Sequence, residues 1–255
     1  MHRLHAILLL PLFLAGCASP GSPLSAHRDA RPISLELEGG RLWQGRNDVR
    51  IPGDGGTLFP ADELIGEGPF TAGRVTLDWD IDARHALRVV FAPLELDGTG
   101  ELAQPTRFDG QTFAAGVPTK GTYRFGSYRL GYRYTFLHEE RWRLRVGGTL
   151  FVRDAEVALE QGATRASDSN VGVVPLVNFA AECFPARRWR LVAELDGLAA
   201  PQGRALDLSL KAHYDLADWC SVGLGYRTIE GGADNDDVYT FAWLNSVVAS
   251  VGFRF

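Results

Sequence analysis

The sequence SYRLGYRYTFL at residues 127–137 decides the fold of this chain. Apolar or aromatic side chains occupy every second position, namely Tyr128, Leu130, Tyr132, Tyr134 and Phe136. The positions between them hold Ser127, Arg129, Gly131, Arg133 and Thr135. A period of two is that of a β-strand, whose successive side chains point to opposite faces. The stretch therefore predicts a strand with one face suited to lipid and the other to water.

The same alternation recurs from Ile33 to the C-terminus, in segments about ten residues long, as membrane-spanning strands require. We predict strands at residues 33–46, 71–82, 86–96, 121–137, 141–157, 170–183, 188–198, 205–216, 219–230 and 238–255. The fold class is therefore all-β: a closed antiparallel up-and-down transmembrane β-barrel of about ten strands, with eight or twelve as the alternatives. The first strand is the least regular, because Gly39 and Gly40 indicate a bulge or a register change.

Two kinds of connection alternate along the chain. Short turns are expected at residues 82–84, 138–140, 185–187 and 217–218, and long loops at residues 51–70, 97–120, 161–170, 199–204 and 231–237. Short turns at one end and long loops at the other are typical of outer-membrane barrels, whose periplasmic ends are short. Four tryptophans lie beside the short turns, where an aromatic girdle is expected: Trp79, Trp142, Trp189 and Trp219.

The N-terminus indicates export. Residues 1–16 combine a charged start with the apolar run from Ala6 to Ala15, which is typical of a signal peptide. Residues 14–17, Leu-Ala-Gly-Cys, look like a bacterial lipobox, so we expect Cys17 to carry lipid; a plain signal peptide with a chance cysteine is the alternative. Residues 17–32 then form a flexible leash, and residues 33–255 form the barrel.

The C-terminus ends in Val251-Gly252-Phe253-Arg254-Phe255. An amphipathic last strand ending in phenylalanine resembles the signature that the barrel assembly machinery of outer membranes recognises. A physical requirement supports the feature, because an unclosed edge strand in lipid would leave backbone groups unpaired. We therefore expect the assembly machinery, outer-membrane lipid and lipopolysaccharide as partners, and the outer membrane as the location.

Composition excludes several classes of function. The formal net charge is -5, so the chain lacks the basic excess of a nucleic-acid-binding protein. Its three cysteines, Cys17, Cys183 and Cys220, include no CxxC pair for zinc. Cys183 and Cys220 lie on strands about 15 Å apart, so we predict that both are free thiols. We expect no cofactor and no metal, although the acidic loop of Asp234, Asn235, Asp236 and Asp237 offers oxygen ligands that calcium prefers.

The polar strand faces predict a lumen filled with charges of both signs. The inward set is Arg74, Asp78, Asp80, Arg88, Arg129, Arg133, Arg143, Arg145, Glu182, Arg190, Glu194, Asp196, Asp207, Lys211, His213, Asp215, Arg227 and Arg254. In a barrel of about ten strands these side chains should pair across the interior and fill it. A narrow pore or a proton-active network is the alternative.

Catalysis on the outside would need a base near the outer loops, and the sequence places none there. His85 and His138 fall at short turns, and His213 falls near the periplasmic end of its strand. Two blocks, residues 46–53 and 230–235, resemble a group of uncharacterised proteobacterial barrel proteins, a resemblance that implies architecture and location only. We expect a non-enzymatic structural or surface-interaction protein. A barrel enzyme acting on envelope lipid or peptide, and a soluble lipocalin-like lipoprotein with its apolar face inward, are the alternatives.

Overall fold

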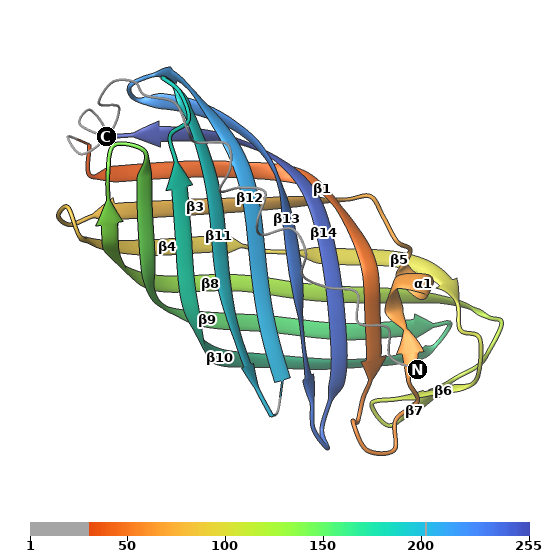
Figure 1. The fold of residues 1–255 in the computed structure, drawn as a ribbon. Coiled ribbons are helices and arrows are strands. Elements are labelled where there is room, and N and C mark those ends of the chain that lie inside the picture. The colour runs from red at the N-terminus through yellow and green to blue at the C-terminus, as the bar shows by residue number, and fades with distance from the viewer. Residues whose placement is uncertain (1–30, 202) are drawn as a thin grey trace, which may run out of the picture.

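The computed structural model describes residues 31–201 and 203–255, which form one β-barrel with a small cap at one end (Figure 1). Its elements are β1 (Ile33–Arg50), β2 (Phe59–Pro60), α1 (Ala61–Ile65), β3 (Phe70–Asp80), β4 (His85–Ala92), β5 (Glu95–Glu101), β6 (Thr106–Phe108), β7 (Gln111–Phe113), β8 (Pro118–His138), β9 (Trp142–Gln161), β10 (Thr164–Cys183), β11 (Trp189–Ala200), β12 (Gly203–Ala217), β13 (Cys220–Asp234) and β14 (Tyr239–Arg254). No helix in the described part of the chain is long and apolar enough to cross a membrane.

The wall is closed and antiparallel throughout. Neighbouring strands follow the order β1, β3, β4, β8 and then β9 to β14, and β14 pairs with β1. β5 continues the line of β4, since both pair with β8, so the wall has ten strand positions. At the join, the amide of Phe255 donates to the carbonyl of Ile33 over 2.8 Å. The predicted ten-stranded up-and-down barrel is confirmed.

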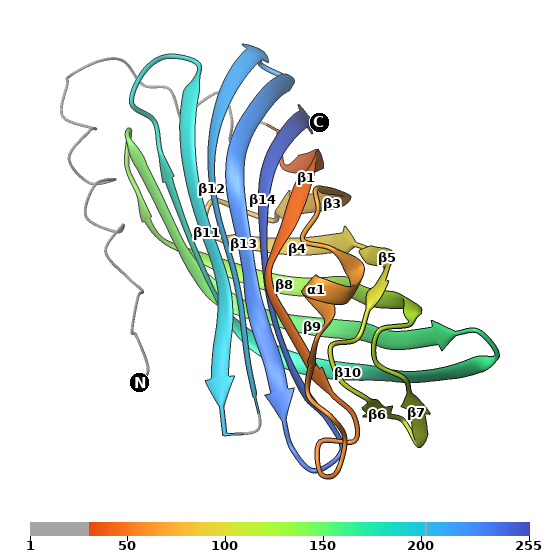
Figure 2. The ribbon, with the colours of Figure 1, turned by 90° about the vertical axis from the view of Figure 1, so that its right-hand side faces the viewer.

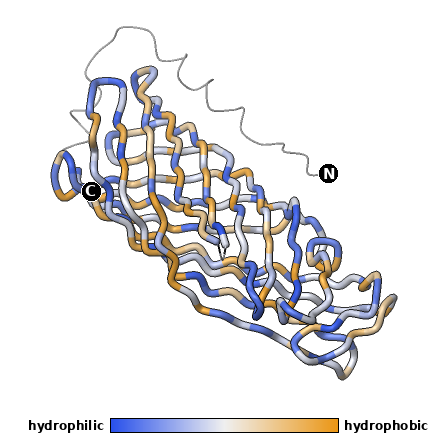
Figure 3. Tube along the Cα trace, turned by 60° about the horizontal axis from the view of Figure 1, so that its bottom comes forward, coloured by the Kyte–Doolittle hydropathy of each residue, from blue (hydrophilic) through white to orange (hydrophobic). Residues whose placement is uncertain are grey.

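Apolar side chains face outward from the wall. Leu130 is 54% exposed, whereas Arg129 beside it on β8 is 5% exposed. Figure 3 shows apolar and polar residues alternating along the strands. Trp79, Trp189 and Trp219 are about half exposed beside the short turns, as the predicted girdle requires. A lipocalin-like barrel would turn these rows inward, so that alternative is excluded.

The strands reach further than the apolar pattern indicates. β9 and β10 pair up to Gln161 and Thr164, so the long loop predicted at residues 161–170 is wrong and a tight turn at Gly162, with φ 60°, replaces it. Ala200 likewise pairs with Gly203, where residues 199–204 were expected to form a loop. Beyond the bilayer a strand needs no lipid-facing row, so the alternation fades while the backbone pairing continues.

Two long connections fold into the cap at the end opposite the short turns. Residues 51–70 supply β2 and α1, and residues 97–120 supply the hairpin of β6 and β7 (Figure 2). Phe59 and Phe108 pack edge to face with ring centroids 6.0 Å apart, and both rings are buried. Leu64 of α1 is also buried in this core, which continues into inward residues of the wall such as Leu42 and Leu159, so the cap is packed onto the outer end of the barrel.

Two local predictions are wrong. Gly39 and Gly40 pair in register with Ala249 and Val248, and the bulge of β1 lies instead between Gln44 and Arg46. Cys183 forms a disulfide, so it is not a free thiol. The distance between the two strands excludes only a Cys183–Cys220 bond, and Cys220 is free.

Candidate functional site in the barrel lumen

The lower and middle lumen, from the short turns upward, is crossed by ion pairs between opposite walls. Glu194 of β11 accepts from Arg88 of β4 and, over 3.1 Å, from Arg133 of β8. Lys211 of β12 pairs with Glu36 and, over 3.1 Å, with Glu38 of β1. Because each pair joins strands on different sides of the cylinder, the side chains occupy the axis and do not line an open channel.

The densest cluster surrounds Asp207, whose side chain is 3% exposed. Its two carboxylate oxygens accept from Arg227 over 2.6 Å, from Arg74 over 2.8 Å and from Arg129 over 2.8 Å. Glu38 supplies a second carboxylate to Arg227 over 3.0 Å. Three cations around two buried anions form a network in which each charge has a partner, as burial of ionic groups requires.

Closer to the short turns the same pattern continues. Asp80 accepts from Arg145 over 3.1 Å, and Asp215 accepts from Arg254 over 2.8 Å. In the β3–β4 turn the backbone amides of Arg84 and His85 donate to Asp82, which holds the pKa of that exposed carboxyl below its usual value. The short-turn end of the barrel is therefore both filled and tied by side chains.

The inward set predicted from the sequence is confirmed as a set of lumen residues. Glu36 and Glu38 were missed, although Leu35 and Leu37 alternate with them in the sequence and could have revealed them. The expected irregularity at Gly39 and Gly40 hid this row. Together these two carboxylates anchor Lys211 and Arg227 to β1.

His213 lies in the lower lumen and is 1% exposed. A Cβ added to Gly223 of β13 would lie 2.7 Å from the Nδ1 atom of His213, so the glycine leaves the space that the imidazole fills. Neither ring nitrogen has a hydrogen-bond partner. This packing indicates a space-filling residue.

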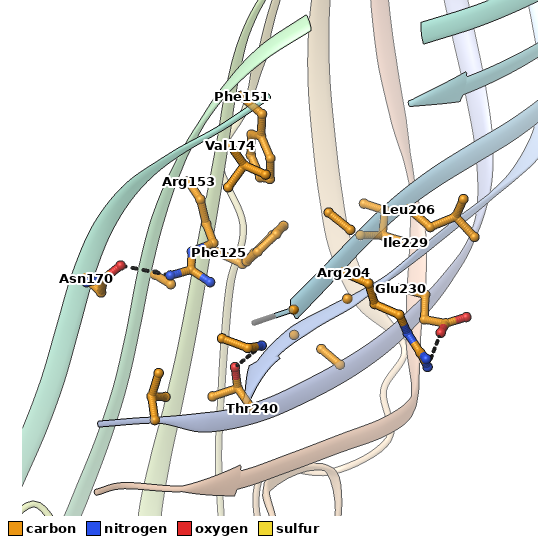
Figure 4. Close-up of a pocket in the computed structure, with 18 of the residues that line it drawn as sticks. Phe125, Phe151, Arg153, Asn170, Val174, Arg204, Leu206, Ile229, Glu230 and Thr240 are labelled. Carbon is orange, nitrogen blue, oxygen red and sulfur yellow. Dashed lines mark hydrogen bonds and ion pairs between the residues drawn. The ribbon is translucent and has the colours of Figure 1, made fainter. Parts of the chain in front are cut away.

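The upper lumen, toward the cap, has a different character, because it contains a cavity of about 470 Å³. Its inward-facing lining is mainly apolar and includes Leu198 and Leu244. Figure 4 labels four more of these apolar residues, namely Phe125, Phe151, Val174 and Ile229. The Phe151 ring lies 5.0 Å from the Arg129 guanidinium, which forms the floor of the cavity together with its partners Asp196 and Asp207. This cavity was not predicted from the sequence. Its signal was the replacement of charges by apolar residues on the inward face of the outer third of most strands, although β9 and β10 keep Arg153, Asp168 and Asn170 there.

The described histidines are not gathered at this cavity, although carboxylates such as Glu156, Asp168 and Asp237 line it. The three described histidines, His85, His138 and His213, all lie toward the short turns. The expected oxygen ligands at residues 234–237 serve the backbone: Asn235 Oδ1 accepts from the amides of Asp237 and Val238. Within residues 31–201 and 203–255 no cluster of three or more histidine, cysteine or acidic residues could hold a metal ion.

The lumen and wall are those of a known architecture. The outer membrane protease OmpT from Escherichia coli is similar over 88% of this chain and 97% of its own, with a TM-score of 0.56 at 9% identity. The fold is that of an outer-membrane β-barrel. The apolar outer wall agrees with it, and we place the chain in the outer membrane.

Two further structures match with lower scores. Ail, the attachment invasion locus protein of Yersinia pestis, gives a TM-score of 0.40 at 12% identity over 88% of this chain and 99% of its own. Neisserial surface protein A gives a TM-score of 0.37 at 10% identity over 88% of this chain and 97% of its own. No protein-family model and no curated protein sequence matches this chain.

Proposed function

We propose that this chain is a filled outer-membrane barrel that acts as a structural or surface-interaction protein and is neither an enzyme nor an open pore. The observation that carries the proposal is the set of ion pairs across the lumen, above all those that join Asp207 to Arg74, Arg129 and Arg227. An ion would have to break several buried charge pairs to pass, and each such break is costly.

The non-enzymatic part of the proposal rests on the place of the histidines. A hydrolase of envelope lipid or peptide needs a base beside its substrate, and substrates outside the cell reach the cap end. His213 is buried below the ion pairs, and His85 bonds to the Tyr132 hydroxyl at the opposite rim. OmpT is named a protease, but at 9% identity the likeness extends to the fold alone.

We expect the purified protein to conduct no ions and to turn over no envelope substrate. Conductance is measured in planar bilayers, and turnover of lipopolysaccharide, phospholipid and peptide is measured on the same preparation. The buried ion pairs predict a flat current trace. Stable single-channel steps would contradict the filled lumen, and turnover that survives repurification would contradict the non-enzymatic role.

The partners proposed for the barrel are outer-membrane lipid and lipopolysaccharide along the wall, and the barrel assembly machinery at the last strand. Phe255 at the end of the chain is 64% exposed, and the Phe253 ring stacks on Trp219 at a centroid distance of 6.3 Å. Until β14 pairs with β1, its backbone edge and its terminal aromatic side chains are available for binding by the assembly machinery.

The lipid anchor expected at Cys17, which lies outside the described residues, stays a prediction, and it competes with the disulfide of Cys183. Cys183 is disulfide-bonded and Cys220 is free in a chain of three cysteines, and an acylated sulfur cannot also form a disulfide. Mass spectrometry of the unreduced protein from outer membranes decides between the two. A chain that begins at Cys17 with an increment for acyl chains, abolished by Cys17→Ala, supports the anchor, and Cys17 in a disulfide or cleavage at another residue contradicts it.

A further inference from the structure

The barrel wall splits between β10 and β11 at its outer end. The two strands pair from Val177 opposite Gly197 down to Cys183 opposite Leu191, and no further toward the cap. β10 continues beyond this point, but its residues 164–176 pair with β9 alone. Figures 1 and 2 show β8, β9 and β10 diverging from β11, β12 and β13.

The residues at this seam suit an edge that opens to lipid. Pro175 lies in β10 just above the last paired residue, and proline in a strand is confined to edges because it lacks an amide donor. Val171 and Val173 face outward and are 69% and 65% exposed. Leu198 of β11 faces the lumen, as residues 194 and 196 do, and is nevertheless 40% exposed. It is exposed because β10 no longer pairs with β11 at this height. The seam therefore joins the apolar outer surface to the upper cavity.

Arg153 of β9 is the one lumen-facing arginine of the described wall that makes no ion pair. Its guanidinium donates to the Asn170 side-chain oxygen over 2.8 Å, and its buried Nε atom has no hydrogen-bond partner. The other cation at the cavity floor, Arg129, is already neutralised by Asp196 and Asp207. A partly buried guanidinium with unused donors is a ready site for a carboxylate or phosphate oxygen.

Arg153 lies level with the upper border of the apolar wall. It is opposite Gly172 in the β9–β10 register, beside Val171, whose next outward neighbour toward the cap is the polar Ser169. An anionic group at Arg153 would therefore lie at headgroup height, while a chain attached to it could enter the cavity toward Phe151 and Leu198. The cavity volume of about 470 Å³ lies within the range of small-molecule sites.

We propose that the upper lumen binds a single-chain anionic amphiphile, which enters from the outer leaflet through the β10–β11 seam. The apolar chain occupies the cavity and the anionic head pairs with Arg153. The chain is held by contact with the apolar part of the lining, which keeps it away from water, and the head is held by charge-assisted hydrogen bonds.

The test uses the full protein in phosphatidylcholine nanodiscs. Three 16-carbon probes carry a photoactivatable diazirine at the chain end and differ in the head: a carboxylate, a phosphate or a neutral alcohol. Mass spectrometry then locates the crosslinks. The proposal predicts crosslinks to lumen residues such as Val174, Leu198 and Ile229 with both anionic probes, and the ratio between the two ranks carboxylate against phosphate. Crosslinks confined to outward-facing residues would mean annular lipid only and would overturn the proposal.

Variants separate the head from the chain. Arg153→Gln is expected to reduce lumen crosslinking of the anionic probes about tenfold and to leave the neutral probe unchanged. Arg165→Gln is the matched control, because the Arg165 side chain is 71% exposed near the β9–β10 turn. Equal losses in both arginine variants, or none in Arg153→Gln, would overturn the role of Arg153.

The chain site is tested by filling it. Val174→Trp places a large ring in the cavity and is expected to abolish lumen crosslinks with all three probes. Val146→Trp, on an outward position of β9 that is 39% exposed, should leave them unchanged. Heat-modified migration on gels verifies that each variant has closed its barrel. Undiminished lumen crosslinking in folded Val174→Trp would overturn the cavity as the site. Conductance remains a separate measurement, so this outcome leaves the filled-barrel proposal untouched.

Discussion

Asp207→Asn is expected to destabilise the barrel by about 3–5 kcal/mol, the cost of removing one partner from a buried ion pair. Arg74, Arg129 and Arg227 all donate to the Asp207 carboxylate at 2.6–2.8 Å. The amide keeps the volume but removes the charge, so three guanidiniums would face only Glu38 and Asp196. The loss is measured as the shift in urea-induced unfolding of the protein in lipid vesicles, followed by tryptophan fluorescence.

The control for this variant is Glu156→Gln. Glu156 pairs with Arg124 over 2.9 Å, but the two side chains are 27% and 39% exposed. Water screens this pair, so its loss should cost less than about 1 kcal/mol. Equal shifts in the urea unfolding of both variants would contradict this prediction. The lumen network would then add no more to the free energy of unfolding than an exposed ion pair does.

The architecture could be predicted from the sequence because the bilayer imposes a strict rule on every strand. An outward residue in hydrocarbon must be apolar, so rows such as Tyr128 to Phe136 on β8 reveal both the strand and its orientation. The inward charges could then be identified as the residues that alternate with this outward row. Arg129 and Arg133 had to face the lumen once their neighbours faced lipid, and both are 5% exposed or less.

Features outside the hydrocarbon could not be predicted in the same way. Above the bilayer either face tolerates polar residues, so the outer ends of β9 and β10 were interpreted as a loop although they pair up to Gln161 and Thr164. The seam depends on where one strand stops pairing with its neighbour. Only Pro175 hinted at it, because register between distant strands is not encoded by the period of either strand alone.

Pairing partners inside the lumen were also beyond sequence reasoning. The set of inward charges followed from parity, but the choice of Asp207 for Arg74, 133 positions earlier in the chain, depends on the tilt of the strands around the cylinder. The upper cavity was missed for a related reason. Phe125, Phe151 and Ile229 share a face with charges lower on their strands, and only the closed barrel brings these three apolar residues to one height.

Leu130→Arg is expected to destabilise the barrel by about 2–4 kcal/mol, the cost of a lipid-facing arginine near the bilayer midplane. Leu130 is 54% exposed on the outer wall, and its position on β8 lies midway between Arg124, which bonds to polar residues at the outer border, and Glu139 in the short turn. A charge at this depth cannot reach water from either side without thinning the bilayer.

Leu216→Arg provides the matched control, since Leu216 is 52% exposed and lies next to the short β12–β13 turn. At the interface the same substitution costs only about 0–1 kcal/mol, because the guanidinium reaches the headgroups. The difference between the two variants in urea unfolding from vesicles therefore measures depth and not the chemistry of arginine. In a barrel with its apolar rows turned inward, Leu130→Arg would be costly because the arginine overpacks the interior, and that cost would not depend on bilayer thickness. The measurement is therefore repeated in thinner vesicles. A Leu130→Arg penalty that shrinks with the bilayer supports the outward orientation of these rows, and a penalty that stays constant contradicts it.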